Sequence, residues 1–338
     1  MAALPDLRDY RSALIVKPSS LGDIVHTLPA VHAIKTAHPH LAIRWIANPE
    51  WLPLLDGSPD IAETLVFPRK ELRGLGGLLR WRSLAAQLRS LPRESPEIVL
   101  DFQGLLRSAM ICRARGSRPI VGLSDAREGA RWFYDYSITV DPGAHAVDRY
   151  LELPRALGVC VEAPVFPLAE GAAVEVQASQ QPFILVHPYS RGEGKSLDAP
   201  SLRALCENLA PYPVIVVGVH REPVTLIGSH ITDLTNSTTL AQLIWLMRRA
   251  RFVISVDSGP MHIAAAVNDF TLGIHTWSDP RQVGPHNPQA WVWKAGRIAH
   301  RGEFSPAECL QAQAVMVMDA RAMAGFVKAA LSGIASPG

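Results

Sequence analysis

The sequence predicts an α/β protein with two units in tandem, each with a parallel sheet covered by helices on both faces. Short apolar runs rich in β-branched residues recur along the chain, and a segment with helical spacing follows each run. The length of 338 residues fits two domains of ~100–200 residues. The expected strands are Ala13–Lys17, Ala42–Ile46, Ile98–Asp101, Ile120–Leu123, Phe183–His187, Val214–Gly218, Phe252–Val256 and Thr271–His275.

A stretch rich in proline and small residues between Glu162 and Pro182 predicts a hinge between the two units. The expected division is a first domain over 1–165, a linker over 166–182 and a second domain over 183–315. The Ala-rich C-terminal segment, 316–338, is expected to form a helix that packs back on the first domain.

Composition excludes several classes of protein. With 48% hydrophobic and 19% charged residues, the chain is neither disordered nor a coiled coil. No apolar run approaches the ~18 residues of a membrane span, and the first residues lack an apolar signal segment, so we expect a cytoplasmic protein. The four cysteines form no CxxC pair, which indicates neither a zinc site nor a disulfide framework.

The net charge of +2 hides a local asymmetry. Between Thr64 and Arg131, thirteen lysines and arginines face six acidic residues, and the rest of the chain is balanced or acidic. This stretch could bind something anionic, or its arginine stems could cover apolar surface. Nucleic acid is disfavoured because no reader motif and no interleaved aromatics accompany it.

Ligands of open α/β sheets bind where strands end and helices begin. At the first such junction, Ser19, Ser20, Gly22 and Asp23 open a helix that we expect to run to about His38. Asp23 could simply complement the helix dipole, or it could accept a proton from a substrate hydroxyl.

The strongest junction is the run from Val256 to His262. Ser258 and Gly259 start a helix there, whose free amides suit a phosphate, and His262 lies one turn further along. A weaker candidate is the glycine-punctuated loop from Pro188 to Lys195, which includes Ser190 and whose lysine is either a phosphate ligand or a solvated charge. Glu222 is expected to open another helix and to bind a ribose or serve only as a helix-terminal charge.

Several motifs are missing. The chain has no P-loop, no dinucleotide fingerprint after a strand, no GxSxG and no HExxH. It also lacks an Asp-x-Asp pair, so a nucleotide-sugar enzyme built on this chain would offset the pyrophosphate charge with protein groups. We therefore expect no metal ion and no cofactor.

Four segments resemble the lipopolysaccharide heptosyltransferases, glycosyltransferase family 9. They are residues 17–29, 101–109 and 257–262 and the pair Asp279 and Pro280. Residues 125–128 and 145–149 are most similar to the heptosyltransferase I group.

The resemblance implies the GT-B architecture, in which two Rossmann-like domains face each other across a cleft. It also implies an inverting, metal-independent transfer of heptose from an ADP-activated donor to the Kdo of a lipid A precursor. The partners would be a nucleotide-sugar and an anionic glycolipid acceptor, and the protein would work at the cytoplasmic face of the inner membrane. It would touch that membrane peripherally and bind no nucleic acid.

The resemblance also assigns roles to residues. Asp23 matches the proposed general base, and Ser20 lies beside it. The donor-binding positions are Ser190, Lys195, Glu222, Asp257, Ser258, Gly259 and His262. The acceptor-binding positions are Ser20, Arg69, Lys70, Gln103, Arg107 and Arg127, which would give the basic stretch its purpose.

Two departures from the family pattern flank the donor positions. Leu197 and Asp198 stand where the family has Trp-Pro, and Thr276 and Trp277 replace a common Gly-Pro. Two other classes therefore stay open: a relative that uses another sugar or acceptor, and a non-catalytic nucleotide-sugar-binding protein. An epimerase or dehydrogenase is disfavoured because it needs a second acid/base or a nicotinamide fingerprint.

Overall fold

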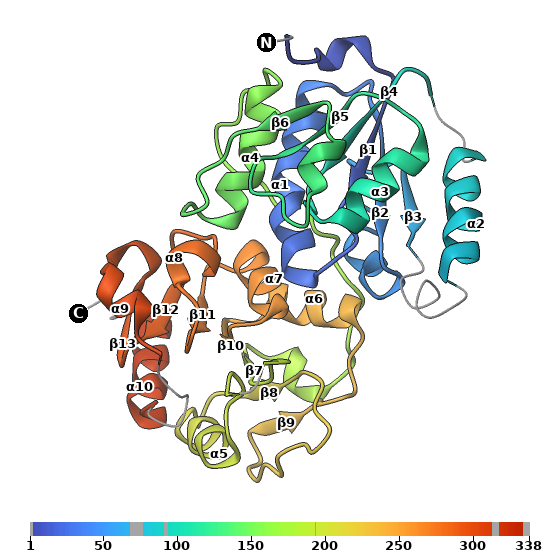
Figure 1. Cartoon of the computed structure of the whole chain (residues 1–338). Coiled ribbons are helices and arrows are strands. Elements are labelled where there is room, and N and C mark those ends of the chain that lie inside the picture. Colours follow the sequence, from blue (N-terminus) through green and yellow to red (C-terminus); the bar gives the residue numbers. More distant parts are fainter. Residues whose placement is uncertain (1–2, 68–76, 91–93, 193, 313–317, 334–338) are drawn as a thin grey trace. The chain divides into compact units, whose positions relative to one another are not determined.

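The chain forms two compact units, Met1–Ala169 and Glu170–Gly338, in a computed structural model (Figure 1). The structure describes residues 3–67, 77–90, 94–192, 194–312 and 318–333. The division between the units falls inside the segment 166–182. Within the described ranges, no helix is long and apolar enough to cross a bilayer.

The first unit holds a six-stranded parallel sheet in the order β3-β2-β1-β4-β5-β6. Its strands are β1 (Ser12–Val16), β2 (Ala42–Ala47), β3 (Glu63–Val66), β4 (Glu97–Asp101), β5 (Ile120–Leu123) and β6 (Tyr136–Ile138). Its helices are α1 (Leu21–Ala37), α2 (Gly77–Ser90), α3 (Leu106–Arg115) and α4 (Ala146–Ala156). The short 3-10 helices are η1 (Leu7–Asp9), η2 (Pro49–Leu54) and η3 (Ala130–Phe133).

The second unit repeats this order with one added hairpin strand, as β13-β12-β11-β10-β7-β8-β9. Its strands are β7 (Ile184–His187), β8 (Val214–Val216), β9 (Ile231–Asp233), β10 (Phe252–Val256), β11 (Thr271–Ile274), β12 (Trp291–Lys294) and β13 (Arg297–His300). Among the strand pairs that the structure describes in this unit, only β12–β13 is antiparallel. The helices are α5 (Ala199–Asn208), α6 (Leu240–Arg249), α7 (Gly259–Val267), α8 (Pro280–Val283), α9 (Pro306–Leu310) and α10 (Ala320–Leu331), with 3-10 helices η4 (Gln177–Gln180) and η5 (Arg301–Glu303).

The prediction of parallel sheets buried on both faces is confirmed. Every residue of β1, β4, β7, β10 and β11 is buried. On one face of the first sheet, Leu14 and Val16 pack against Leu88 of α2 and Ile111 of α3, while α1 and α4 pack together elsewhere in the unit. All eight expected strands are present, although β8 ends at Val216 rather than Gly218.

The expected C-terminal helix is present as α10, and its apolar face belongs to the second unit. In α10, Met323, Ala324, Val327 and Leu331 lie on one face and are buried in the core of the second unit. They pack with Leu202 and Leu205 of α5 over the second sheet. The i, i+4 spacing of these residues gives α10 one continuous apolar stripe, and α5 offers the matching surface.

A buried ion pair ties α3 to the start of β4. The Arg115 guanidinium donates Nε to Glu97 Oε2 at 2.7 Å and Nη2 to Glu97 Oε1 at 2.8 Å, and both side chains are inaccessible to solvent. Ser117 Oγ donates to the same carboxylate. Burial disfavours the ionised Glu97, but Arg115 and Ser117 outweigh it and hold its pKa below the ordinary value. The ionised pair therefore stabilises the fold at neutral pH, and this contribution is lost as the pH falls through the lowered pKa.

Replacing Arg115 tests this arrangement. We expect Arg115→Met to lower the free energy of unfolding by about 3–5 kcal/mol, because it leaves the Glu97 carboxylate buried without its partner. The double variant Arg115→Met/Glu97→Met should recover most of that loss. Urea unfolding at neutral pH measures both.

The matched control is Arg155→Met, whose partner Glu152 is an exposed neighbour one helical turn away. Its cost should stay within about 1 kcal/mol. An Arg115→Met variant as stable as Arg155→Met would contradict the account.

Candidate functional site

The candidate residues gather where the strand order of each sheet reverses. Strands β1 and β4 are neighbours at the centre of the first sheet, and their crossovers lead away in opposite directions. Strands β7 and β10 hold the same position in the second sheet. Loops at the carboxyl ends of such central strands diverge and leave room for a ligand. Each unit therefore has one such place.

In the first unit, Asp23 lies in the first turn of α1, as predicted. Its Oδ2 accepts hydrogen bonds from the Ser20 backbone amide at 3.0 Å and from Ser20 Oγ at 2.7 Å. Ser20 is the N-cap residue of α1. Asp23 is half-buried and Ser20 is exposed, so the carboxylate is fixed in direction yet lies at the surface. Asp23 can therefore complement the dipole of α1 and still present a carboxylate to a ligand.

A buried lysine lies behind this carboxylate. Lys17 Nζ donates to the Phe102 carbonyl and to the Tyr150 hydroxyl, both at 2.8 Å. Burial disfavours its charge, but Tyr150, Asp23 and Asp101 outweigh it and raise the pKa of Lys17. The first site therefore holds a buried positive charge that interacts with Asp23.

The loop after β4 brings Gln103 to the same place. Gln103 Oε1 accepts from the Ser19 amide at 3.2 Å, so this loop and the start of α1 are joined. The loop itself is held by Asp101, which is fully buried and accepts from the amides of Gln103 and Gly104 and from Ser108 and Tyr134. Asp101 therefore has a positioning role.

Two of the predicted acceptor arginines lie beside this loop. The Arg127 amide donates to the Gly104 carbonyl at 2.8 Å, and Gly104 has φ +66° with the Ala126 Cα only 3.2 Å from where a Cβ would be. Arg107 lies in the first turn of α3, and both arginine side chains are exposed. The other two predicted acceptor residues, Arg69 and Lys70, lie outside the described residues.

In the second unit, Asp257 is the centre of the site. Its Oδ2 accepts from Lys195 Nζ at 2.6 Å and from Ser278 Oγ at 2.7 Å. Burial acts to raise the pKa of Asp257, but the His275 ring and the bonds from Lys195 and Ser278 outweigh it and lower that pKa. The Lys195 side chain is 29% exposed, so its ammonium is reachable from solvent while the carboxylate holds it in place.

The start of α7 lies directly after this carboxylate. Ser258 is the N-cap, Gly259 is the first helical residue and His262 is buried in the first turn, as predicted. Ser190 Oγ donates to the Asp257 carbonyl at 3.2 Å. A helix N-terminus and an ammonium group therefore converge on one place, which is the arrangement that binds phosphate groups.

Two contributing residues were not predicted from the sequence. Ser278 donates its only hydroxyl proton to Asp257, so it must accept from His275 Nδ1 at 2.9 Å. This fixes the protonated nitrogen of the neutral His275 ring at Nδ1. Their positions in the sequence could have indicated both residues, because His275 is the last residue of an expected strand and Ser278 directly precedes Asp279 and Pro280.

Glu222 departs from its prediction. The segment after β8 is irregular, so no helix begins at Glu222, and the side chain is exposed. The following residue is Pro223, which disfavours helical backbone at the position before it. Among the described residues, Glu222 forms no hydrogen bond or ion pair with Lys195 or Asp257. The Glu222 backbone carbonyl instead forms a hydrogen bond with the ring of His220. That ring stacks on Tyr189, with 4.7 Å between the ring centroids.

The two sequence departures have structural explanations. Leu197 is buried in the core of the second unit, and Asp198 is the N-cap of α5, accepting from the Ser201 amide at 2.8 Å. Thr276 is buried, and its carbonyl accepts from Lys294 Nζ at 2.7 Å. Trp277 is half exposed and its ring lies against Gly194, beside Lys195.

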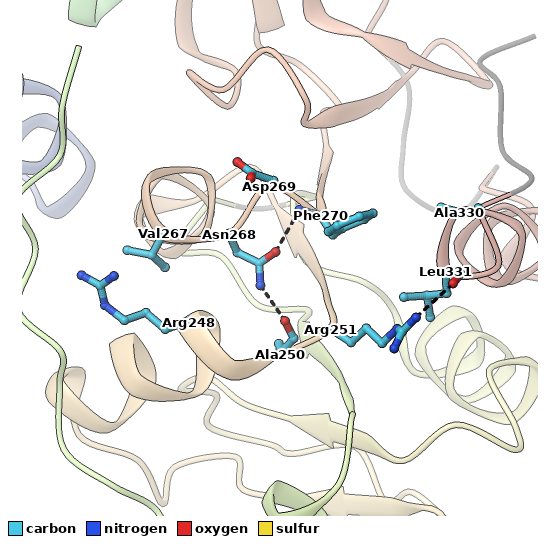
Figure 2. A pocket seen from close by; sticks show the side chains of 10 residues that line it. Arg248, Ala250, Arg251, Val267, Asn268, Asp269, Phe270, Ala330 and Leu331 are labelled. Atoms are coloured by element: carbon cyan, nitrogen blue, oxygen red, sulfur yellow. Dashed lines mark hydrogen bonds between the residues drawn. The ribbon is translucent and has the colours of Figure 1, made fainter. Parts of the chain in front are cut away.

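A pocket of about 500 Å³ in the second unit lies away from this site (Figure 2). Arg251 and Phe270 line it, and they directly precede β10 and β11. The pocket is therefore at the amino ends of the strands, opposite to Asp257. One of its two arginines, Arg251, donates from Nη2 to the Leu331 carbonyl at 3.3 Å, as Figure 2 shows.

Two Rossmann-type sheets, with charged and polar groups at the reversal point of each, are typical of the GT-B fold. The family model described as glycosyltransferase family 9 (heptosyltransferase) matches residues 82–311. The chain therefore belongs to glycosyltransferase family 9, and it is a glycosyltransferase of the heptosyltransferase family.

Relatives and solved structures agree with this assignment. The chain is 28% identical to lipopolysaccharide heptosyltransferase 1 of Pseudomonas aeruginosa over 322 residues, covering 88% of this chain and 86% of the relative. It is similar in fold to E. coli heptosyltransferase WaaC with ADP, at TM-score 0.73 and 20% identity, over 94% of this chain and 99% of that one. E. coli ADP-heptose lps heptosyltransferase II gives TM-score 0.72 and 20% identity, over 95% and 99%. The predicted GT-B fold is confirmed.

Acid should weaken the second unit through its buried histidines. Burial lowers the pKa of His187 and of His275 to about 4. Between pH 6.5 and 4 the unfolded chain binds a proton at each position and the folded chain does not, so stability falls as the pH falls. We expect a loss of about 2 kcal/mol per histidine between pH 7.5 and 5.

Urea midpoints at these two pH values measure the effect. The variant His275→Asn, which keeps a donor near the Nδ1 position, should lose less stability on acidification than the parent. The control His40→Asn removes an exposed ring and should leave the pH dependence unchanged. Equal pH dependence in His275→Asn and the parent would contradict the assignment.

Proposed function

We propose that this glycosyltransferase moves a heptose from ADP-heptose to the Kdo of a lipid A precursor, with inversion and without a metal ion. The observation that carries the proposal is the difference between the two reversal points. The first presents a fixed carboxylate, Asp23, and the second presents a lysine, Lys195, beside a helix N-terminus. One half of the reaction needs a base, and the other half needs positive charge for a departing diphosphate.

The relatives support the choice of donor and acceptor. Two of the similar structures are named for ADP or for ADP-heptose and lipopolysaccharide, and the curated relatives are named lipopolysaccharide heptosyltransferases. The exposed Arg107 and Arg127 beside the Gln103 loop suit the carboxylates and phosphates of such an acceptor. The excess of positive charge between Thr64 and Arg131 fits the same substrate.

In the proposed step, an acceptor hydroxyl lies at Asp23. Its oxygen forms a bond to the anomeric carbon of the donor as the bond from that carbon to the diphosphate oxygen breaks. The hydroxyl proton passes to Asp23, and the electron pair of the broken bond leaves with ADP. A single displacement of this kind needs one base and inverts the anomeric centre.

On the donor side, Lys195 and the amides at Ser258 and Gly259 would stabilise the negative charge of the departing diphosphate. Asp257 positions Lys195, because the 2.6 Å ion pair aims the ammonium toward the start of α7. The same Asp257 oxygen already accepts two hydrogen bonds, which favours lysine over a metal ion as the counter-charge.

The test is mass spectrometry of the product after incubation with ADP-heptose and a Kdo-lipid A acceptor, in the presence of EDTA. The parent protein should form the heptosylated product. Asp23→Asn should lose about 10²–10⁴-fold in turnover, because general base catalysis contributes that much, and should still bind nucleotide.

The control Asp56→Asn removes an exposed carboxylate elsewhere in the first unit and should leave turnover unchanged. Near-normal turnover of Asp23→Asn would sink the assignment of the base. ADP binding without product in the parent would show instead a non-catalytic nucleotide-sugar-binding protein.

A further inference from the structure

Three elements of the first unit, α2, α3 and η3, expose only one kind of charge. Their sequences contain arginines but no aspartate or glutamate. The elements pack side by side, α2 on α3 and α3 on η3. Their exposed arginines, which with the apolar side chains between them we call the α2–α3–η3 face, are Arg82, Arg89, Arg107, Arg113 and Arg131.

These five arginines differ from Arg115, the buried arginine at the end of α3. Arg115 is fully paired with Glu97. In contrast, within the described part of the chain none of the five exposed guanidinium groups forms an ion pair. A carboxylate does border this set, since Glu128 Oε2 accepts from the Leu106 amide at 3.2 Å, but it pairs with none of the five arginines, so their charge can act on a partner.

Apolar side chains lie between these arginines. Leu106, Met110 and Arg113 follow one another at i, i+4 and i+7 along α3, and Leu106 and Met110 are 39% and 37% exposed. Trp81 and Phe133 line a groove of about 370 Å³ between the three elements. Ala85, Arg89, Met110, Arg113 and Ala114 complete its lining.

Trp132 is the most exposed large apolar side chain among the described residues, at 91%. It lies on η3 next to Phe133, and its ring rests over Gly129, where a Cβ would come within 3.3 Å of it. The fold therefore presents an indole to solvent, flanked by Arg131. Tryptophan and arginine together are typical of surfaces that meet the boundary between lipid headgroups and acyl chains.

We propose that the α2–α3–η3 face docks on an anionic lipid bilayer. The guanidinium groups contact lipid phosphates, and Trp132, Leu106 and Met110 enter the headgroup boundary. The complete absence of carboxylates from the three elements favours a negatively charged surface over a mixed protein surface. Arg107 belongs both to this face and to the surroundings of Gln103. Docking would therefore bring the proposed acceptor site to the bilayer. Only this consequence for the acceptor site rests on the proposed function.

Vesicle co-sedimentation of the full chain tests the proposal without any substrate. The vesicles are phosphatidylcholine alone or phosphatidylcholine mixed with phosphatidylglycerol. The parent should bind the mixed vesicles and release them at high salt. The triple variant Arg82→Glu/Arg89→Glu/Arg113→Glu should bind on the order of 100-fold more weakly or worse, because each basic residue near the surface contributes about fivefold.

A second variant separates the apolar contribution. Trp132→Ala should weaken binding by about tenfold, and Trp132→Phe should recover part of it. The matched controls lie in the second unit: Arg321→Glu for the charge and Leu310→Ala for an exposed apolar side chain. Both controls should bind as the parent does, and circular dichroism confirms that every variant is folded.

Three results would overturn the proposal: unchanged binding of the triple variant, no binding of the parent to anionic vesicles, or a parent dimer in ultracentrifugation that Trp132→Ala dissociates. The last would make the face a protein interface. Transfer to a deacylated, water-soluble acceptor separates this proposal from the proposed function. Vesicle binding without transfer would leave the docking face intact and refute the function, and transfer without vesicle binding would do the reverse.

Discussion

The reversal of strand order at the centre of each sheet decides where chemistry can take place in this protein. Parallel strands are joined by right-handed crossovers, so helices that lead from β1 and β4 must lie on opposite faces of the sheet. The loops at the ends of these strands separate as a consequence, and backbone amides and helix N-termini are left facing a common opening. The same order recurs in the second sheet at β7 and β10, which supplies a second opening of the same kind.

The two openings differ in how they use an aspartate at the same topological position. Asp101 ends β4 and Asp257 follows β10. Asp101 is fully buried and accepts from two amides, a serine and a tyrosine, so it is fully occupied in shaping a loop. Asp257 instead holds a lysine that is partly open to solvent. One fold therefore provides a carboxylate site at α1 and a cationic site at α7, and the difference arises from which partners the neighbouring loops supply.

Sequence reasoning was most accurate where burial is complete. The continuous apolar runs of β1, β4, β7 and β10 have no other stable place than a sheet covered on both faces. The overlooked strands are β3, β6, β9, β12 and β13. Four of them, β3, β6, β9 and β13, are short, lie at the sheet edges and are partly exposed, so their composition carries little signal. The fifth, β12, is mostly buried but only four residues long. At Glu222 the expected helix is missing because the following residue, Pro223, disfavours helical backbone at the position before it. The bond from Ser278 to Asp257 joins two strand ends, and no local pattern encodes such a contact.

The central claim is that Lys195, at the second opening, binds the donor diphosphate. Titration calorimetry with ADP, UDP and GDP on the parent and on Lys195→Met measures this most directly, with Lys35→Met of the first unit as the matched control. The account predicts preference for ADP, an affinity at least about tenfold weaker in Lys195→Met because a charge-assisted hydrogen bond is lost, and no change in Lys35→Met. An ADP affinity in Lys195→Met equal to that of the parent would contradict it.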